Sequence, residues 1–260
     1  MRSLWSGSIA FGLVNIPVKL FSAIRERALD FDMLDKKDLS HIKFKRINEN
    51  TGKEVPWDNI VKGYEIKGKY VVLTDEDFES ASPEKTKTID LEQFVKLSEI
   101  DVILFDAAYY LAPAKGGERA FSLLQEVLDN SQRAGVGTFV LRNKEKPVVV
   151  RPAQKLLILH TLRFANEIRD PSEFEIKKTT TPKKELAMAK TLVEQMSDNF
   201  NIGNFKDTYT TKLMKRIRAK ASGKKLPAPK AVVNAPVNDL FDQLQKSLTK
   251  PKSSGKKKKK

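Results

Sequence analysis

The sequence predicts a mixed, mainly β fold that continues into helices and then into a disordered basic tail. Three observations support this class. Short apolar or β-branched runs, separated by turn residues, fill the first two-thirds of the chain. Apolar residues recur at helical spacing after Asp170 and Pro171. The last forty residues are rich in Lys and Pro, a composition that cannot bury enough surface to fold alone.

The first strands are expected within residues 9–20, where apolar and small or polar residues alternate. The phase of this alternation reverses at Val14 and Asn15, which suggests a bulge or bend between two strand segments. Two of the later runs, 148–150 and 156–159, lack polar alternation and are expected to be buried on both faces. Further strands are expected at 102–105, 109–111, 138–141, 148–151 and 156–161.

Helices are expected in three places. One interrupts the strands, with Phe121, Leu124, Val127 and Leu128 on one face and an end near residues 130–135. In the second, Thr181 is the expected N-cap, Pro182 the first helical residue and Gly203 the break. Its apolar stripe comprises Leu186, Ala189, Leu192, Val193, Met196 and Phe200. The third carries Tyr209, Leu213 and Ile217, with basic residues between them.

The tail begins after Ser222 and Gly223. It contains four prolines between 227 and 251 and five terminal lysines. Within it, after a possible cap at Asn238, a short helix over 238–249 is expected to carry a small apolar face of Leu240, Phe241, Leu244 and Leu248.

Net charge is concentrated at the C-terminal end. Residues 211–260 hold 16 Lys and Arg against two acids, whereas residues 1–210 hold 32 bases and 31 acids. The tail can therefore attract any polyanion, and a DNA-binding face elsewhere must be local. The absence of Cys excludes disulfides and thiolate sites. Polar residues interrupt the apolar N-terminal run, and no run is long enough to span a membrane, so we expect a soluble, cytoplasmic protein.

Signatures of catalysis are weak. The two histidines, His41 and His160, lie in no recognisable catalytic motif, and His160 is expected to be a strand-end or core residue. The sequence 135–137 lacks the third glycine of a dinucleotide loop. The acidic run 75–77 is expected to open a helix or lie in a solvated loop, in preference to binding a metal. We therefore expect no enzyme activity and no cofactor.

Basic residues at strand spacing are the sharper signal. In 41–47, His41, Lys43 and Lys45 are expected to share one strand face, opposite Ile42 and Phe44. In 64–73, the same reasoning places Glu65, Lys67 and Lys69 opposite Tyr64, Ile66 and Tyr70, and Lys85 and Lys87 repeat the spacing. Charges about 6.6 Å apart along a strand suit a row of phosphates and cannot specify bases. A solvated face is the alternative for any one strand, but three such segments favour a binding surface.

Several separated motifs closely resemble bacterial Ku proteins, in the order of that family. They are Met1–Leu20, Ser82–Ile89, Tyr109–Pro113 followed by 115–118, 162–165 and 169–171. The resemblance covers about residues 1–220. It implies a β-barrel with an extended DNA-encircling bridge at about 40–88, both within residues 1–175, and a helical arm at 176–222 that embraces a second subunit. The flexible Lys-rich tail occupies 223–260.

By this resemblance the protein is expected to bind double-stranded DNA ends as a ring-shaped homodimer in non-homologous end joining. It is expected to act at the bacterial nucleoid and to recruit an ATP-dependent multidomain DNA ligase through Leu240, Phe241, Leu244 and Leu248. The alternatives are an architectural DNA-coating protein without end preference and a nuclease or ligase-like enzyme. The candidate phosphate contacts are Lys43, Lys45, Arg46, Lys53, Lys62, Lys67, Lys69, Lys85, Lys87 and, more weakly, Arg142.

Overall fold

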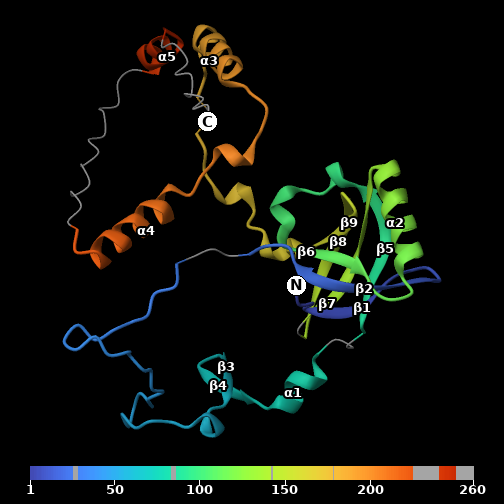
Figure 1. The fold of residues 1–260 in the computed structure, drawn as a ribbon, viewed down its shortest axis with the longest axis vertical. Helices are drawn as coiled ribbons and strands as arrows, with labels where there is room; N and C mark the ends of the chain where they lie inside the picture. The colour runs from blue at the N-terminus through green and yellow to red at the C-terminus, as the bar shows by residue number, and fades with distance from the viewer. Residues whose placement is uncertain (26–28, 83–85, 142, 178, 225–239, 250–260) are drawn as a thin grey trace. The chain divides into compact units, whose positions relative to one another are not determined.

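A closed barrel of seven strands forms the core of the N-terminal unit, Met1–Glu173, in the computed structural model (Figure 1). A second unit begins at Phe174. The structure describes residues 1–260 except 26–28, 83–85, 142, 178, 225–239 and 250–260. The mainly β class and the barrel are thus confirmed. In barrel order the strands are β1 (Trp5–Phe11), β2 (Val14–Ser22), β6 (Phe105–Pro113), β9 (Leu156–Leu162), β8 (Lys144–Ala153), β7 (Arg133–Leu141) and β5 (Thr88–Lys96).

The first two strands form a hairpin. The two expected strand segments are confirmed, but the bulge or bend expected at Val14 and Asn15 is instead a tight turn at Gly12 and Leu13, because Phe11 pairs with Val14. Gly12 takes a positive φ of 55° at the turn, a conformation that costs glycine little. Leu13 is fully exposed at the tip. The change of alternation phase therefore marks a tight turn between antiparallel strands.

One end of the barrel carries both attachments of the long connection from β2 to β5. Strand β1 has β2 and β5 as its two neighbours, antiparallel and parallel respectively. Leu20, near the end of β2, pairs opposite Trp5, and Thr88, the first residue of β5, pairs opposite Ser8. The chain therefore leaves and re-enters the barrel beside the start of β1.

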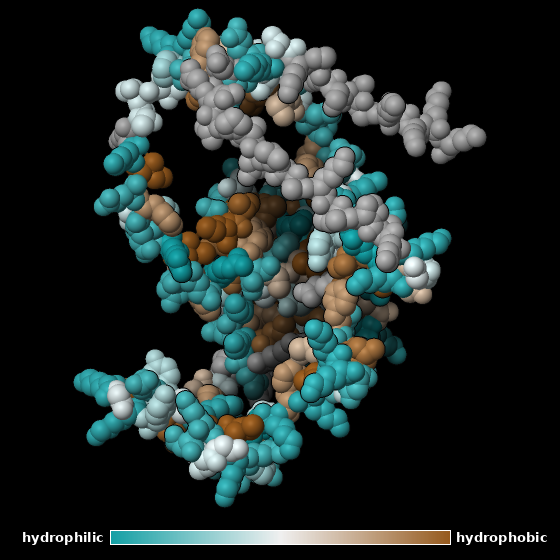
Figure 2. Space-filling view, turned by 90° about the vertical axis from the view of Figure 1, so that its left-hand side faces the viewer, coloured by the Kyte–Doolittle hydropathy of each residue, from teal (hydrophilic) through white to brown (hydrophobic). Residues whose placement is uncertain are grey.

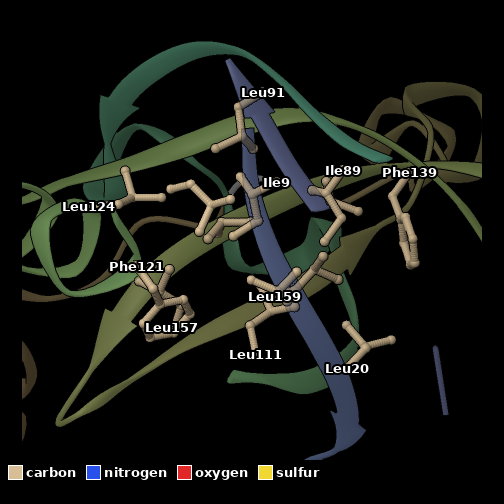
Figure 3. Packing of buried hydrophobic residues seen from close by; sticks show 14 of the residues in the cluster. Ile9, Leu20, Ile89, Leu91, Leu111, Phe121, Leu124, Phe139, Leu157 and Leu159 are labelled. Atoms are coloured by element: carbon tan, nitrogen blue, oxygen red, sulfur yellow. The ribbon is translucent and has the colours of Figure 1, made fainter. Parts of the chain in front are cut away.

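The barrel interior is filled by alternate residues of its strands. Ile9, Leu20, Ile89, Leu111 and Leu159 are fully buried and point toward one another in the interior (Figure 3). Helix α2 (Glu118–Ser131) adds Phe121, Leu124 and Leu128 to the same cluster, as the helical spacing predicted, while Val127 stays half exposed. Gln132 caps the C-terminal end of α2 in a left-handed conformation. Burial on this scale is what holds the barrel closed.

The outer surface of β7 and β8 is also covered, by apolar residues of the segment that precedes β6. Val148 and Val150 point into the interior cluster, whereas Val149 lies in a second cluster with Ala134 and Leu104. Burial of 148–150 on both faces is therefore confirmed. It was wrong for 156–159, where Leu157 and Leu159 are fully buried but Leu156 and Ile158 are only partly buried.

The segment before β6 supplies part of this cover and is not a strand. Residues Val102–Leu104 form a 3₁₀ turn, in which the Asp101 carboxylate accepts a hydrogen bond from the Ile103 amide at 3.0 Å. The expected strand at 102–105 was wrong because its apolar residues serve a turn that packs beside the barrel.

The second unit contains α3 (Lys183–Met196), α4 (Thr208–Ala221) and α5 (Leu240–Thr249). Helix α3 starts one residue later than expected, with Pro182 as its cap, and ends at Met196, well before Gly203. Phe200 therefore lies outside the helix. The possible cap Asn238 lies outside the described residues. The described α5 nevertheless confirms the short helix expected in the tail.

Candidate nucleic-acid interface

The long connection between β2 and β5 carries most of the candidate phosphate contacts. We call residues 29–82 of this connection, all of which the structure describes, the bridge segment; it lies at the bottom of Figure 1. It contains the hairpin β3 (Lys62–Ile66) and β4 (Lys69–Leu73) and helix α1 (Asp75–Ser80). No residue of this segment is buried. The segment therefore presents its side chains to solvent or to a partner and does not form a core of its own.

Residues 41–47 are not a strand, so the predicted alternation of faces there was wrong. Only single β-bridges occur in this stretch, between Leu34 and His41 and between Ile47 and Glu54. The chain folds back through a tight loop that begins at Asn48, whose amide donates to the Lys53 carbonyl at 2.9 Å. The Asn48 side-chain oxygen accepts hydrogen bonds from the amides of Asn50 and Thr51. Local turn chemistry therefore outweighs the strand pattern.

This loop gives two of the candidate cations neighbours that sequence reasoning missed. The Lys45 ammonium lies 2.7 Å from the Glu54 carboxylate, and both side chains are more than half exposed. The Arg46 guanidinium lies 4.5 Å from the centre of the Trp57 ring, and its Nε donates to the Val55 carbonyl at 3.4 Å. The ring restricts where the guanidinium lies, and a guanidinium can make two parallel hydrogen bonds to a phosphate.

The hairpin corrects the second predicted strand, 64–73. The chain turns at Lys67 and Gly68, which both take positive φ values, the pattern of a two-residue hairpin turn. Ile66 therefore pairs with Lys69, and Glu65 pairs with Tyr70. Because paired residues project to the same face, Lys69 shares the face of Tyr64 and Ile66. The expected separation of Lys69 from these apolar residues was wrong.

Another cation of the hairpin lies against an aromatic ring. The Lys62 ammonium is 4.5 Å from the centre of the Phe78 ring in α1. Helix α1 begins at the acidic run 75–77, which confirms the expectation that this run opens a helix. Thr74 and Asp77 cap each other there, with the Thr74 amide 2.8 Å from the Asp77 carboxylate. This bond lowers the pKa of Asp77.

The remaining candidates separate into two groups. Lys43, Lys53, Lys67 and Lys69 are exposed, and the structure shows no side-chain partner for them among the residues it describes. Lys87 is exposed too, but its carbonyl accepts a hydrogen bond from the Ser8 amide at 2.9 Å, so it belongs to the barrel entrance. Lys85 and Arg142 lie outside the described residues.

Exposed apolar and aromatic side chains accompany the cations on the bridge segment. Phe44 is 79% exposed, Trp57 69% and Tyr70 73%. In Figure 2, which keeps the vertical axis of Figure 1, brown residues lie among teal ones over this segment at the bottom of the view. Sequence reasoning placed Phe44 and Tyr70 on apolar strand faces, but it did not predict their exposure or include Trp57. Such a surface is typical of a binding interface.

The predicted ligase-docking residues split into two kinds. On α5, Phe241, Leu244 and Leu248 are partly buried, whereas Leu240 is 57% exposed. Helix α5 packs against α3, where the Lys184 ammonium lies 5.1 Å from the centre of the Phe241 ring. Three of the four residues therefore already have a neighbour within their own chain.

Two kinds of catalytic site can be compared with the structure: a metal-binding cluster and an active-site histidine. Within the described ranges, no three or more His, Asp or Glu side chains gather as a metal site would require. His160 lies in β9, where its Nε2 accepts a hydrogen bond from Arg151 at 3.1 Å and its ring packs edge-on against Phe105. Burial and the Arg151 charge lower the pKa of His160. Its contacts are those of a structural residue.

The helices are short or polar. Among those that the structure describes, none combines the length and the hydropathy that crossing a bilayer requires.

Comparisons with known proteins agree with the barrel. A family model described as the Ku70/Ku80 beta-barrel domain matches residues 10–188. A protein of Opitutus terrae named "Non-homologous end joining protein Ku" is 43% identical and aligns over 99% of this chain and 95% of its own length. Proteins of the same name from Coxiella burnetii and Archaeoglobus fulgidus are each 38% identical, over 98% and 95% of this chain and 98% of their own lengths. The chain belongs to the Ku family.

Proposed function

We propose that this protein binds the ends of double-stranded DNA in non-homologous end joining, and that it acts by binding without a reaction of its own. Family membership and the names of the relatives support the pathway. The observation that carries the DNA contact is the bridge segment, an excursion from the barrel without buried residues that exposes cations and aromatic rings together. Cations of this kind neutralise phosphates without reading bases.

The protein is proposed to act as a homodimer that encircles the duplex. Exposed apolar residues along the bridge segment, such as Phe44 and Tyr70, are costly in water and are stabilised when a second copy covers them. Two such segments, each attached at both ends to a barrel, would close a ring. A ring can be entered only by a free DNA terminus, which explains end preference without any contact to the bases.

The candidate phosphate contacts in this proposal are Lys43, Lys45, Arg46, Lys53, Lys62, Lys67 and Lys69 of the bridge segment, with Lys87 at the barrel entrance. Lys85 and Arg142 stay predictions from the sequence. The proposed site of action is the bacterial nucleoid. The proposed second partner is an ATP-dependent multidomain DNA ligase that docks on α5 through Leu240, Phe241, Leu244 and Leu248.

The test compares a covalently closed DNA minicircle with the same molecule cut once. We expect the full-length protein to be retained on the cut DNA and not on the closed circle, measured by gel shift at about 150 mM salt, where non-specific contacts are weak. Nicked circles control for the effect of a strand break without an end. Equal retention on closed and cut molecules would refute the ring. It would favour the architectural DNA-coating alternative, which the 16 Lys and Arg of residues 211–260 also support.

A further inference from the structure

Helix α4 is the most basic described element outside the bridge segment. It carries Lys212, Lys215, Arg216, Arg218 and Lys220, and the sequence holds no acid between Asp207 and Asp239. The Asp207 carboxylate caps the helix by accepting a hydrogen bond from the Thr210 amide at 2.9 Å. At the other end Gly223 takes a positive φ of 70°, and the Lys224 amide donates to the Ala219 carbonyl at 2.8 Å. The helix is therefore well terminated and fixes the spacing of its cations.

This charge pattern destabilises the helix by itself. Lys215 lies three residues from both Lys212 and Arg218. Each like-charge pair at this spacing costs about 0.2–0.5 kcal/mol. The helix dipole favours cations in the last turn, which accounts for Arg218 and Lys220. It does not account for Lys212 and Lys215. An external polyanion would turn these repulsions into attractions.

The helix also offers a shaped surface. The described residues that line a hollow of ≈ 490 Å³ all lie on one face of α4: Thr210, Thr211, Met214, Lys215 and Arg218. Lys215 and Arg218 are exposed, and no ion pair to them is found among the residues that the structure describes. A spacing of three residues corresponds to a rise of about 4.5 Å and places the ammonium and the guanidinium on the same side of the helix, so both can contact one phosphate backbone.

We propose that α4 is a second phosphate-binding surface for double-stranded DNA and that, unlike the ring, it needs no DNA end. The proposal rests on the proposed function for the identity of the ligand as DNA. In this proposal the bridge segment selects DNA ends, whereas α4 binds cut and closed DNA equally well. Lys212, Lys215 and Arg218 are the residues that we expect to contact phosphates.

The test uses the full-length chain with Lys212→Gln, Lys215→Gln and Arg218→Gln combined. Glutamine keeps a helix propensity close to that of Lys and Arg, so loss of charge is separated from loss of helix, and circular dichroism checks this. We expect the dependence of log K on log salt to flatten by about 2.7 for cut DNA, and residual binding to closed circles at low salt to fall. The preference for cut over closed DNA should remain.

A control variant removes three charges from the same unit, with Lys183→Gln, Lys190→Gln and Lys206→Gln. These lysines are exposed and lie outside α4. An equal flattening in both variants, or an unchanged slope in the α4 variant, would overturn the proposal. So would a loss of binding to anionic phosphatidylserine vesicles with DNA binding intact, since that result would assign α4 to a lipid surface. If the unaltered protein showed no end preference, the ring would be refuted, but the change in salt slope would still test whether α4 binds DNA.

Discussion

Individual cations of the bridge segment differ in how far the protein itself orients them. Arg46 lies over Trp57 and Lys62 over Phe78, so both are held against rings. Lys45 is paired with Glu54 in an exposed ion pair, which is worth about 0–1 kcal/mol and yields easily to a phosphate. Lys43 is exposed without a described partner. In the proposed complex, we expect the cations held against rings to position the duplex and the others to follow its backbone.

Removing two of these cations tests the bridge segment at the scale of residues. In the variant with Lys43→Ala and Lys45→Ala, we expect the slope of log K against log salt to fall by about 1.8, because each lost phosphate contact releases about 0.9 fewer counterions. Fluorescence anisotropy with cut DNA at 50–200 mM salt measures it. The matched variant, Lys36→Ala and Lys37→Ala, loses the same charge from a neighbouring turn and should keep the slope. If it does not, net charge alone drives binding.

At the scale of elements, local turns explain why the bridge segment lacks the two continuous strands that the sequence predicted. The β3–β4 hairpin and the loop around Asn48 reverse the chain inside runs that resemble continuous strands. The residues responsible, Gly68 and Asn48, are visible in the sequence. Their effect on which side chains share a face depends on the register, which alternation alone does not reveal.

Helix α5 provides the test at this scale. We expect Leu244→Asp to release α5 from α3 and to abolish stimulation of the ligase, because a charge on a partly buried apolar stripe costs about 1–2 kcal/mol or more. Binding of cut DNA should be unchanged. Hydrogen exchange of α3 reports the release, and nick-joining with the ligase reports stimulation.

Leu240→Asp is the companion variant, because Leu240 is exposed. It should weaken ligase stimulation while α5 stays on α3. A parallel loss of DNA binding and ligase stimulation in Leu244→Asp would instead make the stripe structural.

For the whole molecule, the main question is what stabilises the bridge segment, because it differs from the barrel in burial. The barrel buries a continuous apolar cluster, whereas the bridge segment buries none of its residues. An ordered segment without a core must gain stability elsewhere, because fixing each residue costs about 1–2 kcal/mol of conformational entropy. A second copy and bound DNA are the proposed sources of that stability.

Dimerisation is the corresponding prediction. Sedimentation equilibrium should give a mass near twice the 29.4 kDa of the chain. We expect Phe44→Asp to weaken the dimer about 10- to 100-fold, the equivalent of about 1.5–3 kcal/mol of lost apolar burial. Leu13→Asp, at the exposed tip of the β1–β2 hairpin, is the control and should leave the dimer intact. A monomer at all concentrations would exclude this mode of ring closure.

Much of the barrel was predictable from the sequence because its signals are local and redundant. Burial of 148–150, the face of α2 and the position of most strands follow from apolar periodicity. Positions where a turn interrupts a run were not predictable from periodicity. Gly12, Asp101 and Lys67 each mark such a turn, and at each one hydrogen bonding or a positive φ outweighed the apolar pattern.

By itself, the sequence determined the mainly β class, the family resemblance and the concentration of positive charge, since these depend on residue types and their order. Only the tertiary structure decided the neighbours of each charge: Trp57 beside Arg46, Glu54 beside Lys45, and α3 beside α5. The physical reason is that charge and apolarity belong to single residues, whereas contacts between residues distant in the chain depend on how the chain folds back.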